Sequence, residues 1–157
     1  MARAERSKRL TVCVHRRAKH DYDILQTVEA GLILQGSEVK ALREGKGNLV
    51  DAWVSLKDNK PLLHNLEISP YSHDNAGSDG DTRRTRGLLL HKAEIRKLLA
   101  GLREKGLTLV PLEVYFHGPW AKVEVGLCRG RRKADKRQKL KSREAQRDID
   151  RAMRKRR

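Results

Sequence analysis

The charged side chains of this chain fall into three blocks, and this division limits where a hydrophobic core can form. Residues 1–20 carry seven basic and one acidic side chain, residues 21–128 carry 14 and 15, and residues 129–157 carry 15 and four. The last block holds only six apolar residues, too few to offset the entropy lost on folding. The core of this 157-residue chain must therefore form within the nearly neutral middle, as a single domain.

Alternation of apolar and polar residues predicts that this middle part is mainly β-sheet. Apolar residues occupy most second positions in four stretches, and two further apolar runs are bounded by turns; the six segments are 10–14, 24–34, 50–56, 62–68, 107–116 and 121–127. Asp58-Asn59-Lys60-Pro61 and His117-Gly118-Pro119 are typical turn sequences. We expect an antiparallel sheet of six or seven strands, whose full or partial closure would protect its edges.

Two helices are expected to interrupt these strands. Ser37 is a suitable N-cap for a short helix over residues 38–44, which Gly45 ends. A longer helix over residues 91–105 has an apolar stripe at helical spacing, and Gly106 ends it. We therefore expect three parts: a basic arm (residues 1–9), a barrel domain with two or three helices (residues 10–128), and a basic tail (residues 129–157).

The basic tail is expected to bind a polyanion, because binding releases the counterions condensed on it. Nucleic acid fits better than an anionic membrane, since a membrane-bound helix needs a bulky apolar face that the tail lacks. A solvated tail without a partner is the alternative. Ala145, Ile149, Ala152 and Met153 form a narrow helical stripe, but charge repulsion opposes that helix in water. We expect a tail that is disordered alone and helical on a phosphate-rich surface.

The sequence contains no motif of an enzyme or a metal site. Its histidines (His15, His20, His64, His73, His91 and His117) show no HxxxH or HExxH spacing, and no P-loop or GxSxG motif occurs. The two cysteines form no CxxC pair, and no apolar run approaches the ~18 residues of a membrane span. We expect a cytoplasmic protein without metal or cofactor, with a ribonuclease that uses His and Lys as the enzymatic alternative.

Eight ordered strings resemble small protein B (SmpB), the SsrA-binding protein family of bacteria, over residues 10–145. They are Arg17-Ala18-Lys19-His20-Asp21-Tyr22, Glu29-Ala30-Gly31, Gly36-Ser37-Glu38-Val39-Lys40-Ala41-Leu42-Arg43, Gly45-Lys46-Gly47-Asn48-Leu49, Ile68-Ser69-Pro70-Tyr71, Leu88-Leu89-Leu90-His91-Lys92, Lys105-Gly106-Leu107-Thr108-Leu109-Val110-Pro111-Leu112 and Asp135-Lys136-Arg137. Each string alone is a weak signal, whereas the ordered set is specific to this family.

This resemblance implies an OB-like antiparallel barrel and a function without catalysis. The barrel would bind the tRNA-like domain of transfer-messenger RNA (tmRNA, or SsrA RNA) and deliver it to stalled ribosomes. The basic tail would enter the empty mRNA channel beside the small-subunit decoding centre, so that the stalled peptide is tagged and released. Elongation factor Tu would take part indirectly, through the charged tmRNA.

The resemblance also assigns roles to individual residues. RNA contact is implied for Glu29, Leu89 and His91, and more loosely for Lys19, His20, Lys40 and Arg43. Ribosome and mRNA-channel contact is implied for tail residues Gly130, Asp135, Lys136, Arg137, Leu140 and Lys141. The chain has His15 where the family usually has Asn, and Ala134 where His or Tyr is common.

The chemistry of Glu29 restricts how a carboxylate can serve an RNA-binding surface. It repels phosphate, so it should accept hydrogen bonds from base amino groups or 2′-hydroxyls, or orient a neighbouring Lys or Arg. A buried ion pair is the structural alternative. Leu89 would either pack on a base or fill the core. A general RNA chaperone or ribosome-assembly factor is the alternative to the SmpB function.

Overall fold

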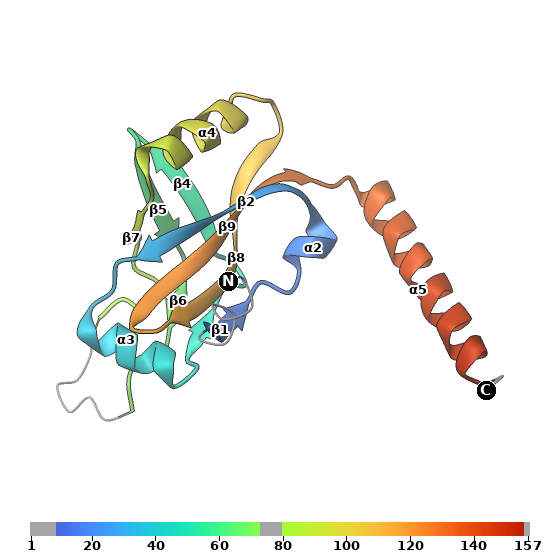
Figure 1. Ribbon diagram of the computed structural model, residues 1–157, viewed down its shortest axis with the longest axis horizontal. Coiled ribbons are helices and arrows are strands. Elements are labelled where there is room, and N and C mark those ends of the chain that lie inside the picture. The colour runs from blue at the N-terminus through green and yellow to red at the C-terminus, as the bar shows by residue number, and fades with distance from the viewer. Residues whose placement is uncertain (1–8, 73–79, 156–157) are drawn as a thin grey trace.

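The computed structural model describes residues 9–72 and 80–155 (Figure 1). Its strands are β1 (Arg9–Val14), β2 (Tyr22–Leu32), β3 (Gly47–Asn48), β4 (Trp53–Lys57), β5 (Lys60–His64), β6 (Glu67–Ile68), β7 (Arg86–Leu89), β8 (Leu107–His117) and β9 (Trp120–Gly130). Its helices are α2 (Ala18–Asp21), α3 (Gly36–Arg43), α4 (Lys92–Leu102) and α5 (Lys133–Lys155).

Seven of the strands form one antiparallel sheet that closes on itself. The order is β1-β8-β4-β5-β7-β2-β9, and β9 also pairs with β8, so six strands complete a ring with β1 added outside. The β8–β9 hairpin is paired from Leu107–Arg129 to His117–Trp120, whereas β4 joins β8 only through Val54 and Leu109. The mainly β, barrel-like fold predicted from the alternation is therefore confirmed.

The two predicted turns join the strands as expected. Asp58 and Asn59 link β4 to β5 with φ of 51° and 59°, the left-handed conformation at both positions of a type I′ turn. Gly118, with φ of 58°, lies in the tight turn between β8 and β9. Residues that tolerate positive φ at these points keep both hairpins in register.

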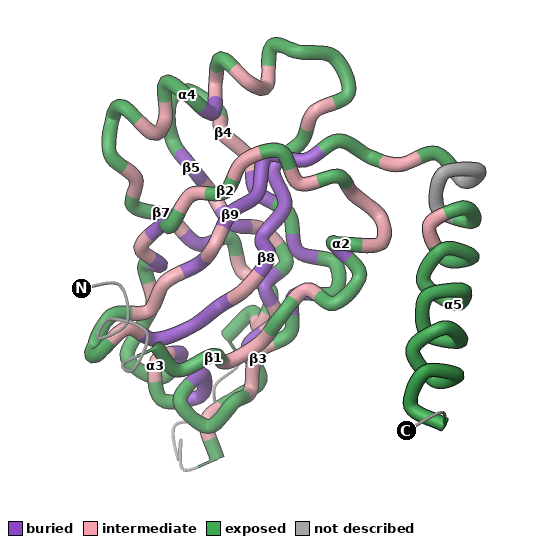
Figure 2. Tube along the Cα trace, turned by 45° about the vertical axis from the view of Figure 1, so that its right-hand side comes forward, coloured by how far each residue is buried: buried purple, intermediate pink, exposed green. Residues whose placement is uncertain are grey.

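The barrel has its core inside and a second apolar cluster outside. The alternating apolar residues of the strands fill the interior, which is visible as buried positions along β8 and β9 (Figure 2). The second cluster joins Ala18 of α2 to Val110, Leu112 and Cys128. A bulge between Pro111 and Glu113 gives β8 one extra residue, Leu112, which packs in this outer cluster. Helix α2 therefore covers one end of the outer face of β8 and β9.

The two predicted helices exist, but their ends differ from the prediction. The expected cap Ser37 is wrong: α3 begins at Gly36 with Gln35 as N-cap, whose backbone N–H donates to Glu38 at 2.9 Å. Gly45, with φ of 78°, follows the helix as predicted. Helix α4 ends at Leu102 rather than Lys105, and His91 is its N-cap.

The tail shows a difference between expectation and structure. We expected no fixed structure in the absence of a polyanion, whereas the structure gives residues 133–155 as one helix, α5, extending away from the barrel (Figure 1). Leu140, Ile149 and Met153 are exposed on it. Local contacts favour the helix, since Gln146 donates to Asp150 at 3.0 Å and Arg151 lies 3.8 Å from Asp148. Disorder of the tail in the free protein stays a prediction.

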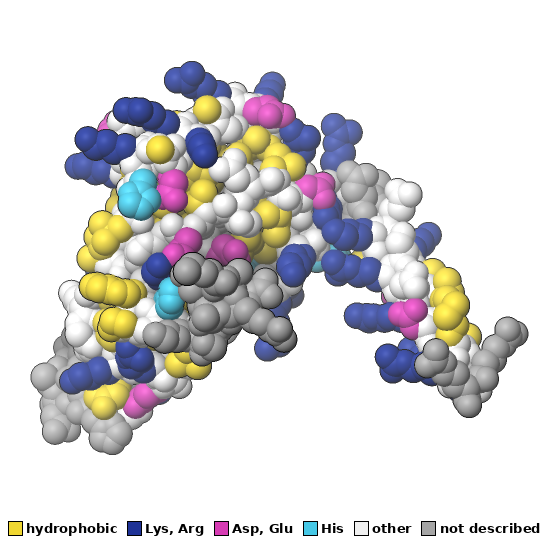
Figure 3. Space-filling model, viewed as in Figure 1, with side chains coloured by type: hydrophobic (Ala, Val, Ile, Leu, Met, Phe, Trp, Pro, Cys, Tyr) yellow, Lys and Arg dark blue, Asp and Glu magenta, His cyan; other side chains and the backbone are white. Residues whose placement is uncertain are grey.

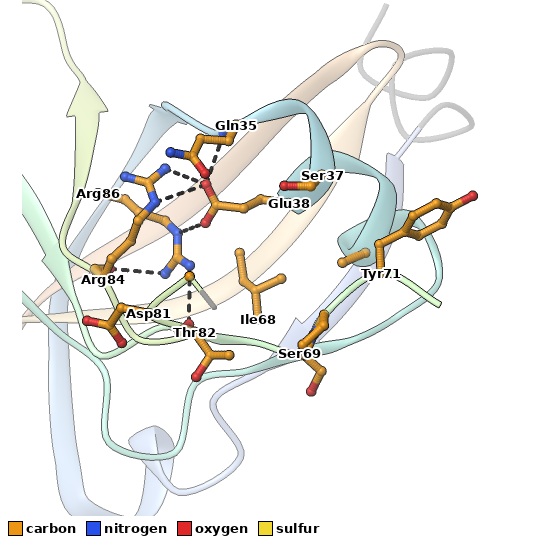
Figure 4. A pocket seen from close by; sticks show the side chains of 13 residues that line it. Gln35, Ser37, Glu38, Ile68, Ser69, Tyr71, Asp81, Thr82, Arg84 and Arg86 are labelled. Atoms are coloured by element: carbon orange, nitrogen blue, oxygen red, sulfur yellow. Dashed lines mark hydrogen bonds and ion pairs between the residues drawn. The ribbon is translucent and has the colours of Figure 1, made fainter. Parts of the chain in front are cut away.

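A buried ion network, which the sequence does not reveal, ties α3 to β7. Arg86 is 1% exposed, and its guanidinium donates to the Glu38 carboxylate (Figure 4). It also donates to the backbone carbonyl of Leu66. Arg84 donates to the same carboxylate. Glu38, Arg84 and Arg86 line a cleft of about 300 Å³, which Tyr71 also lines. Because the buried guanidinium and the carboxylate satisfy each other, removing either one would leave the other without its partner.

We predict that Arg86→Met lowers the free energy of unfolding by about 3–5 kcal/mol, because it leaves the buried Glu38 and the Leu66 carbonyl short of donors. Arg83→Met, which removes an exposed pair with Glu67, should cost less than about 1 kcal/mol. Urea unfolding at pH 7 measures both values. Equal losses would contradict a structural role for the buried network.

The same network predicts the sign of a pH dependence. Burial raises the pKa of Glu38, but hydrogen bonds from Arg84, the Gln35 backbone and Arg86 lower that pKa further, to below its ordinary value. The stabilisation is therefore complete above the unfolded pKa of about 4.3 and is lost as the pH falls through the lower folded pKa. Urea unfolding repeated at decreasing pH should show that the free energy of unfolding falls less steeply with pH in Arg86→Met than in the wild type.

Candidate nucleic-acid interface

The outer face of the barrel carries a row of three glutamates across three neighbouring strands. Strand register places Glu29 of β2 opposite Glu124 of β9, and Glu124 opposite Glu113 of β8. Residues that pair directly across an antiparallel sheet point to the same face. Three like charges side by side repel each other, and neighbouring cations or hydrogen-bond donors can reduce this repulsion.

Basic and hydroxyl groups supply partners for two of these carboxylates. The Tyr115 hydroxyl and the Lys122 ammonium both donate to Glu29. Arg9 donates to Glu113 at 2.5 Å, and the Arg9 guanidinium carbon lies 3.7 Å from the centre of the Tyr115 ring. We call Glu29, Tyr115 and Lys122 the carboxylate site. Its side chains come from three strands and are held in place by this bonding.

The carboxylate site keeps Glu29 ionised. Burial raises the pKa of Glu29, but hydrogen bonds from Lys122 and Tyr115 lower that pKa further, so the net shift is downward. Burial, together with the hydrogen bond to Glu29, raises the pKa of Tyr115, which therefore stays a donor. Glu29 is 46% exposed and acts at neutral pH as a fixed acceptor that neighbouring cations partly neutralise. Glu29 is therefore paired but not buried, which excludes the buried ion pair as its role.

Leu89 lies next to the carboxylate site, on the surface and not in the core. It is 63% exposed and pairs with Gly31 of β2, which pairs on its other side with Lys122. A Cβ atom on Gly31 would lie 3.2 Å from the Leu89 Cβ, so the glycine lets Leu89 lie close across β2. Lys122, Gly31 and Leu89 therefore form a second row, adjacent to Glu29.

The other predicted RNA contacts lie in separate places. His91 is exposed at the start of α4, and its backbone N–H donates to Glu94 at 3.0 Å. On α3, the Arg43 guanidinium lies 4.3 Å from the centre of the Phe116 ring. The Lys40 ammonium lies 5.7 Å from the centre of the Tyr71 ring. Lys40 and Arg43 therefore lie on α3, whereas His91 caps α4 two residues after Leu89.

Lys19 and His20 lie on α2, close to the base of the tail. Lys19 is exposed, and His20 Nδ1 is 2.9 Å from Asp21. His15, which stands where the family usually has Asn, has its Nδ1 3.1 Å from the Pro111 carbonyl. This contact joins the end of β1 to β8. His64 has a structural contact: it stacks on Trp53 with ring centres 3.9 Å apart.

The predicted tail residues are distributed along the end of β9 and the first turns of α5. Gly130 is the last residue of β9 and pairs with Tyr22. Arg137, Leu140 and Lys141 are exposed on α5. The side chains of Asp135 and Lys136 lie outside the described residues. Figure 3 shows Lys and Arg side chains over α4 and along the side of α5 that faces the barrel.

Sequence reasoning missed the partners of Glu29. Tyr115 and Lys122 are paired across β8 and β9, but Glu29 reaches them only because β2 pairs with β9. The one available signal in the sequence was the alternation in residues 121–127, which places Lys122 on the outward face of its strand. In the described ranges, 9–72 and 80–155, there is no cluster suited to a metal ion and no helix able to cross a membrane.

Comparison with known proteins gives one consistent family. The family described as SmpB protein matches residues 12–155. The chain is 50% identical to the SsrA-binding protein of Microcystis aeruginosa over 139 residues, covering 88% of this chain and 90% of that protein. It is 47% identical to the SsrA-binding protein of Geobacillus thermodenitrificans over 145 residues, covering 92% and 93%.

A solved structure agrees with the sequence relatives. A chain from the work described as "tmRNA-SmpB: a journey to the center of the bacterial ribosome" superposes with a TM-score of 0.65 at 46% identity. The superposition covers 82% of this chain and 93% of that chain. The similarity therefore extends over the barrel rather than over a single motif.

We predict that Tyr115→Phe raises the pKa of Glu29, because it removes one of the hydrogen bonds that stabilise the carboxylate. Titration of the side-chain carboxyl carbons by NMR measures this change. Tyr22→Phe, which removes a hydroxyl beside the outer apolar cluster, serves as the control and should leave the pKa of Glu29 unchanged. An unchanged pKa in Tyr115→Phe would show that the bond does not hold Glu29.

Proposed function

The chain belongs to the SmpB family of SsrA-binding proteins, and from this premise we propose a division of labour between its barrel and its tail. The protein is an SsrA-binding protein of trans-translation and not an enzyme, and its partners are tmRNA and the ribosome. The barrel binds the tRNA-like domain of tmRNA, and the tail acts in the mRNA channel. Both act through shape and charge, in the cytoplasm.

The carboxylate site, with the exposed Leu89 beside it, is the observation that supports RNA binding by this face. The ionised Glu29 accepts hydrogen bonds, for which base amino groups and 2′-hydroxyls are the donors that RNA offers. Lys122 offsets part of its charge and so reduces repulsion of the phosphates. Leu89 offers apolar area for a base or ribose. Because Tyr115 fixes Glu29, little side-chain entropy is lost on binding.

The remaining predicted residues fit a wider RNA footprint around this site. Lys40 and Arg43 present positive charge on α3, and His91 lies two residues beyond Leu89. Lys19 and His20 lie at the base of the tail. We propose that these residues contact phosphates or riboses, whereas Glu29 and Leu89 contact bases.

We propose that the tail detects an mRNA channel that is empty downstream. Its 15 basic residues suit the phosphates of ribosomal RNA that line such a channel. An mRNA already in the channel would exclude the tail by steric and electrostatic competition. The Gly130, Asp135, Lys136 and Arg137 motif, with Leu140 and Lys141, makes these contacts. Elongation factor Tu joins the complex through the charged tmRNA.

We predict that Glu29→Arg weakens tmRNA binding by about tenfold or more, because it removes the acceptor and the bonds that organise the site. Glu67→Arg changes the net charge equally at a half-buried glutamate of β6, which pairs with β3 in a separate two-stranded sheet, and it should have little effect. Competition of tmRNA against bulk tRNA at fixed salt measures both. Similar small effects of the two variants would argue against the assigned site.

The same competition assay separates the alternative functions. An RNA chaperone or ribosome-assembly factor would bind bulk tRNA and tmRNA with similar affinity, whereas an SsrA-binding protein prefers tmRNA. Cleavage of labelled RNA that disappears when His15 and His20 are replaced would instead indicate a ribonuclease.

Truncation after Gly130 should leave tmRNA affinity largely intact and abolish peptide tagging, because the truncated chain keeps the whole barrel and loses α5. Filter binding and a tagging assay on stalled ribosomes measure the two activities separately. Equal loss of both would refute the division of labour.

A further inference from the structure

One arginine between the barrel and the tail is bonded to the barrel on several sides. Arg131 follows the last residue of β9, and its side chain is 9% exposed. Its Nε donates to the Asp23 carboxylate at 2.8 Å, and its Nη1 donates to the carbonyls of Lys19 at 2.9 Å and His20 at 3.3 Å. The planar guanidinium therefore joins the end of α2 to the start of β2.

Two further bonds strengthen this junction. The Arg131 backbone N–H donates to the Asp21 carbonyl at 3.0 Å, and the Lys139 ammonium of α5 donates to the Lys19 carbonyl at 3.4 Å. The carbonyls at the end of α2 have no partner within that short helix, so tail residues satisfy them. We call Arg131, Lys139, Asp23 and the carbonyls of Lys19 and His20 the tail clamp.

The neighbouring arginines are placed differently. Arg129 is 49% exposed and pairs with Glu104, which is 61% exposed, and Arg132 is exposed. The Arg131 side chain is thus held against the barrel, whereas the nearby Arg129 and Arg132 side chains are exposed to solvent. An arginine that served only to attract phosphate would gain nothing from this placement, because its donors are occupied.

We propose that the tail clamp sets the direction in which α5 leaves the barrel, which makes Arg131 and Asp23 positioning residues for the tail. This inference rests on the proposed function, in which the barrel is held by one RNA while the tail acts on another. A tail that swivels freely at Gly130 would lose more conformational freedom when it enters its channel. A clamped tail starts from the correct direction, so less freedom is lost.

Because Asp23 is acidic, the proposal and its alternative predict different outcomes for tagging when its charge is removed. An acidic side chain does not bind phosphate, and removing it from a basic protein strengthens non-specific RNA binding. If Asp23 only repelled RNA, Asp23→Asn would leave tagging unchanged or increase it. If Asp23 holds the tail clamp, Asp23→Asn reduces tagging although the variant is more basic.

The first experiment compares matched variants of the full-length protein. Asp23→Asn and Arg131→Met should each reduce the tagging rate on stalled ribosomes by about fivefold or more, with tmRNA affinity within about twofold of the wild type. Glu104→Gln and Arg83→Met remove the same charges from exposed ion pairs of the barrel and should keep wild-type tagging. Arg131→Lys retains the charge but loses the planar guanidinium with its several donors, so its tagging rate should lie between those of the wild type and Arg131→Met.

A second experiment measures the direction of the tail without RNA or ribosome. Spin labels on Ala93→Cys of α4 and Ala145→Cys of α5 report the distance between barrel and tail by pulsed EPR. Burial raises the pKa values of the native Cys13 and Cys128 to about 11, so both thiols react slowly with the label at neutral pH. The distance distribution should be narrower in the otherwise unchanged protein than in Asp23→Asn or Arg131→Met.

The two experiments distinguish the proposal from the function on which it rests. Failure of the unmodified protein to prefer tmRNA or to support tagging would refute the proposed function, whereas the EPR distances test the tail clamp by themselves. Equal tagging in Asp23→Asn and Glu104→Gln, or equal distance distributions with and without Asp23, would overturn the tail clamp. Parallel loss of tmRNA affinity and tagging in Arg131→Met would show an RNA contact instead.

Discussion

The pairing of β8 with three other strands is the constraint on which the rest of the molecule depends. Its first residues pair with β9 and, through Leu109, with β4, which closes the ring; its last residues pair with β9 and β1. The bulge after Pro111 lies between these halves. Because a bulge increases twist and bends the strand, β8 can pair with β4 at one end, where the ring closes, and with β1 at the other. The same register turns Glu113 and Tyr115 outward, toward Glu124 and Lys122.

Charge is arranged differently on the barrel and on the tail. On the barrel, Glu29 and Glu113 pair with nearby basic side chains, and residues 21–128 sum to a charge of −1, whereas residues 129–157 sum to +11. Paired charges recognise a partner by geometry, and their energy depends weakly on salt when they are partly desolvated. Unpaired basic residues act mainly by counterion release, which depends strongly on salt. The proposed RNA contacts of the two parts of the chain would therefore differ in their dependence on salt.

The sequence predicted the parts of the fold that depend on local periodicity. Strands β2, β8 and β9 and the turns at Asp58-Asn59 and Gly118 follow from alternation and from residues that tolerate positive φ. Strand β7 was missed because Arg86 resembles a surface residue, and only the opposing Glu38 allows it to be buried. The places of Glu29 and Leu89 in a site came from the family resemblance. Their contacts required the pairing of β2 with β7 and β9, which no local pattern encodes.

The tail clamp also bears on how α5 forms. Starting a helix is costly because several residues must be fixed before the first hydrogen bonds form, and repulsion among the basic residues adds to that cost. Arg131 and Lys139 are fixed to α2, one before the helix and one within its second turn. Residues between them are thereby restrained at both ends, which lowers the entropy lost in nucleation. Each further turn then adds hydrogen bonds at a smaller cost, and phosphates along the channel would remove the remaining repulsion. The barrel therefore contributes to the order of a segment that has no core of its own.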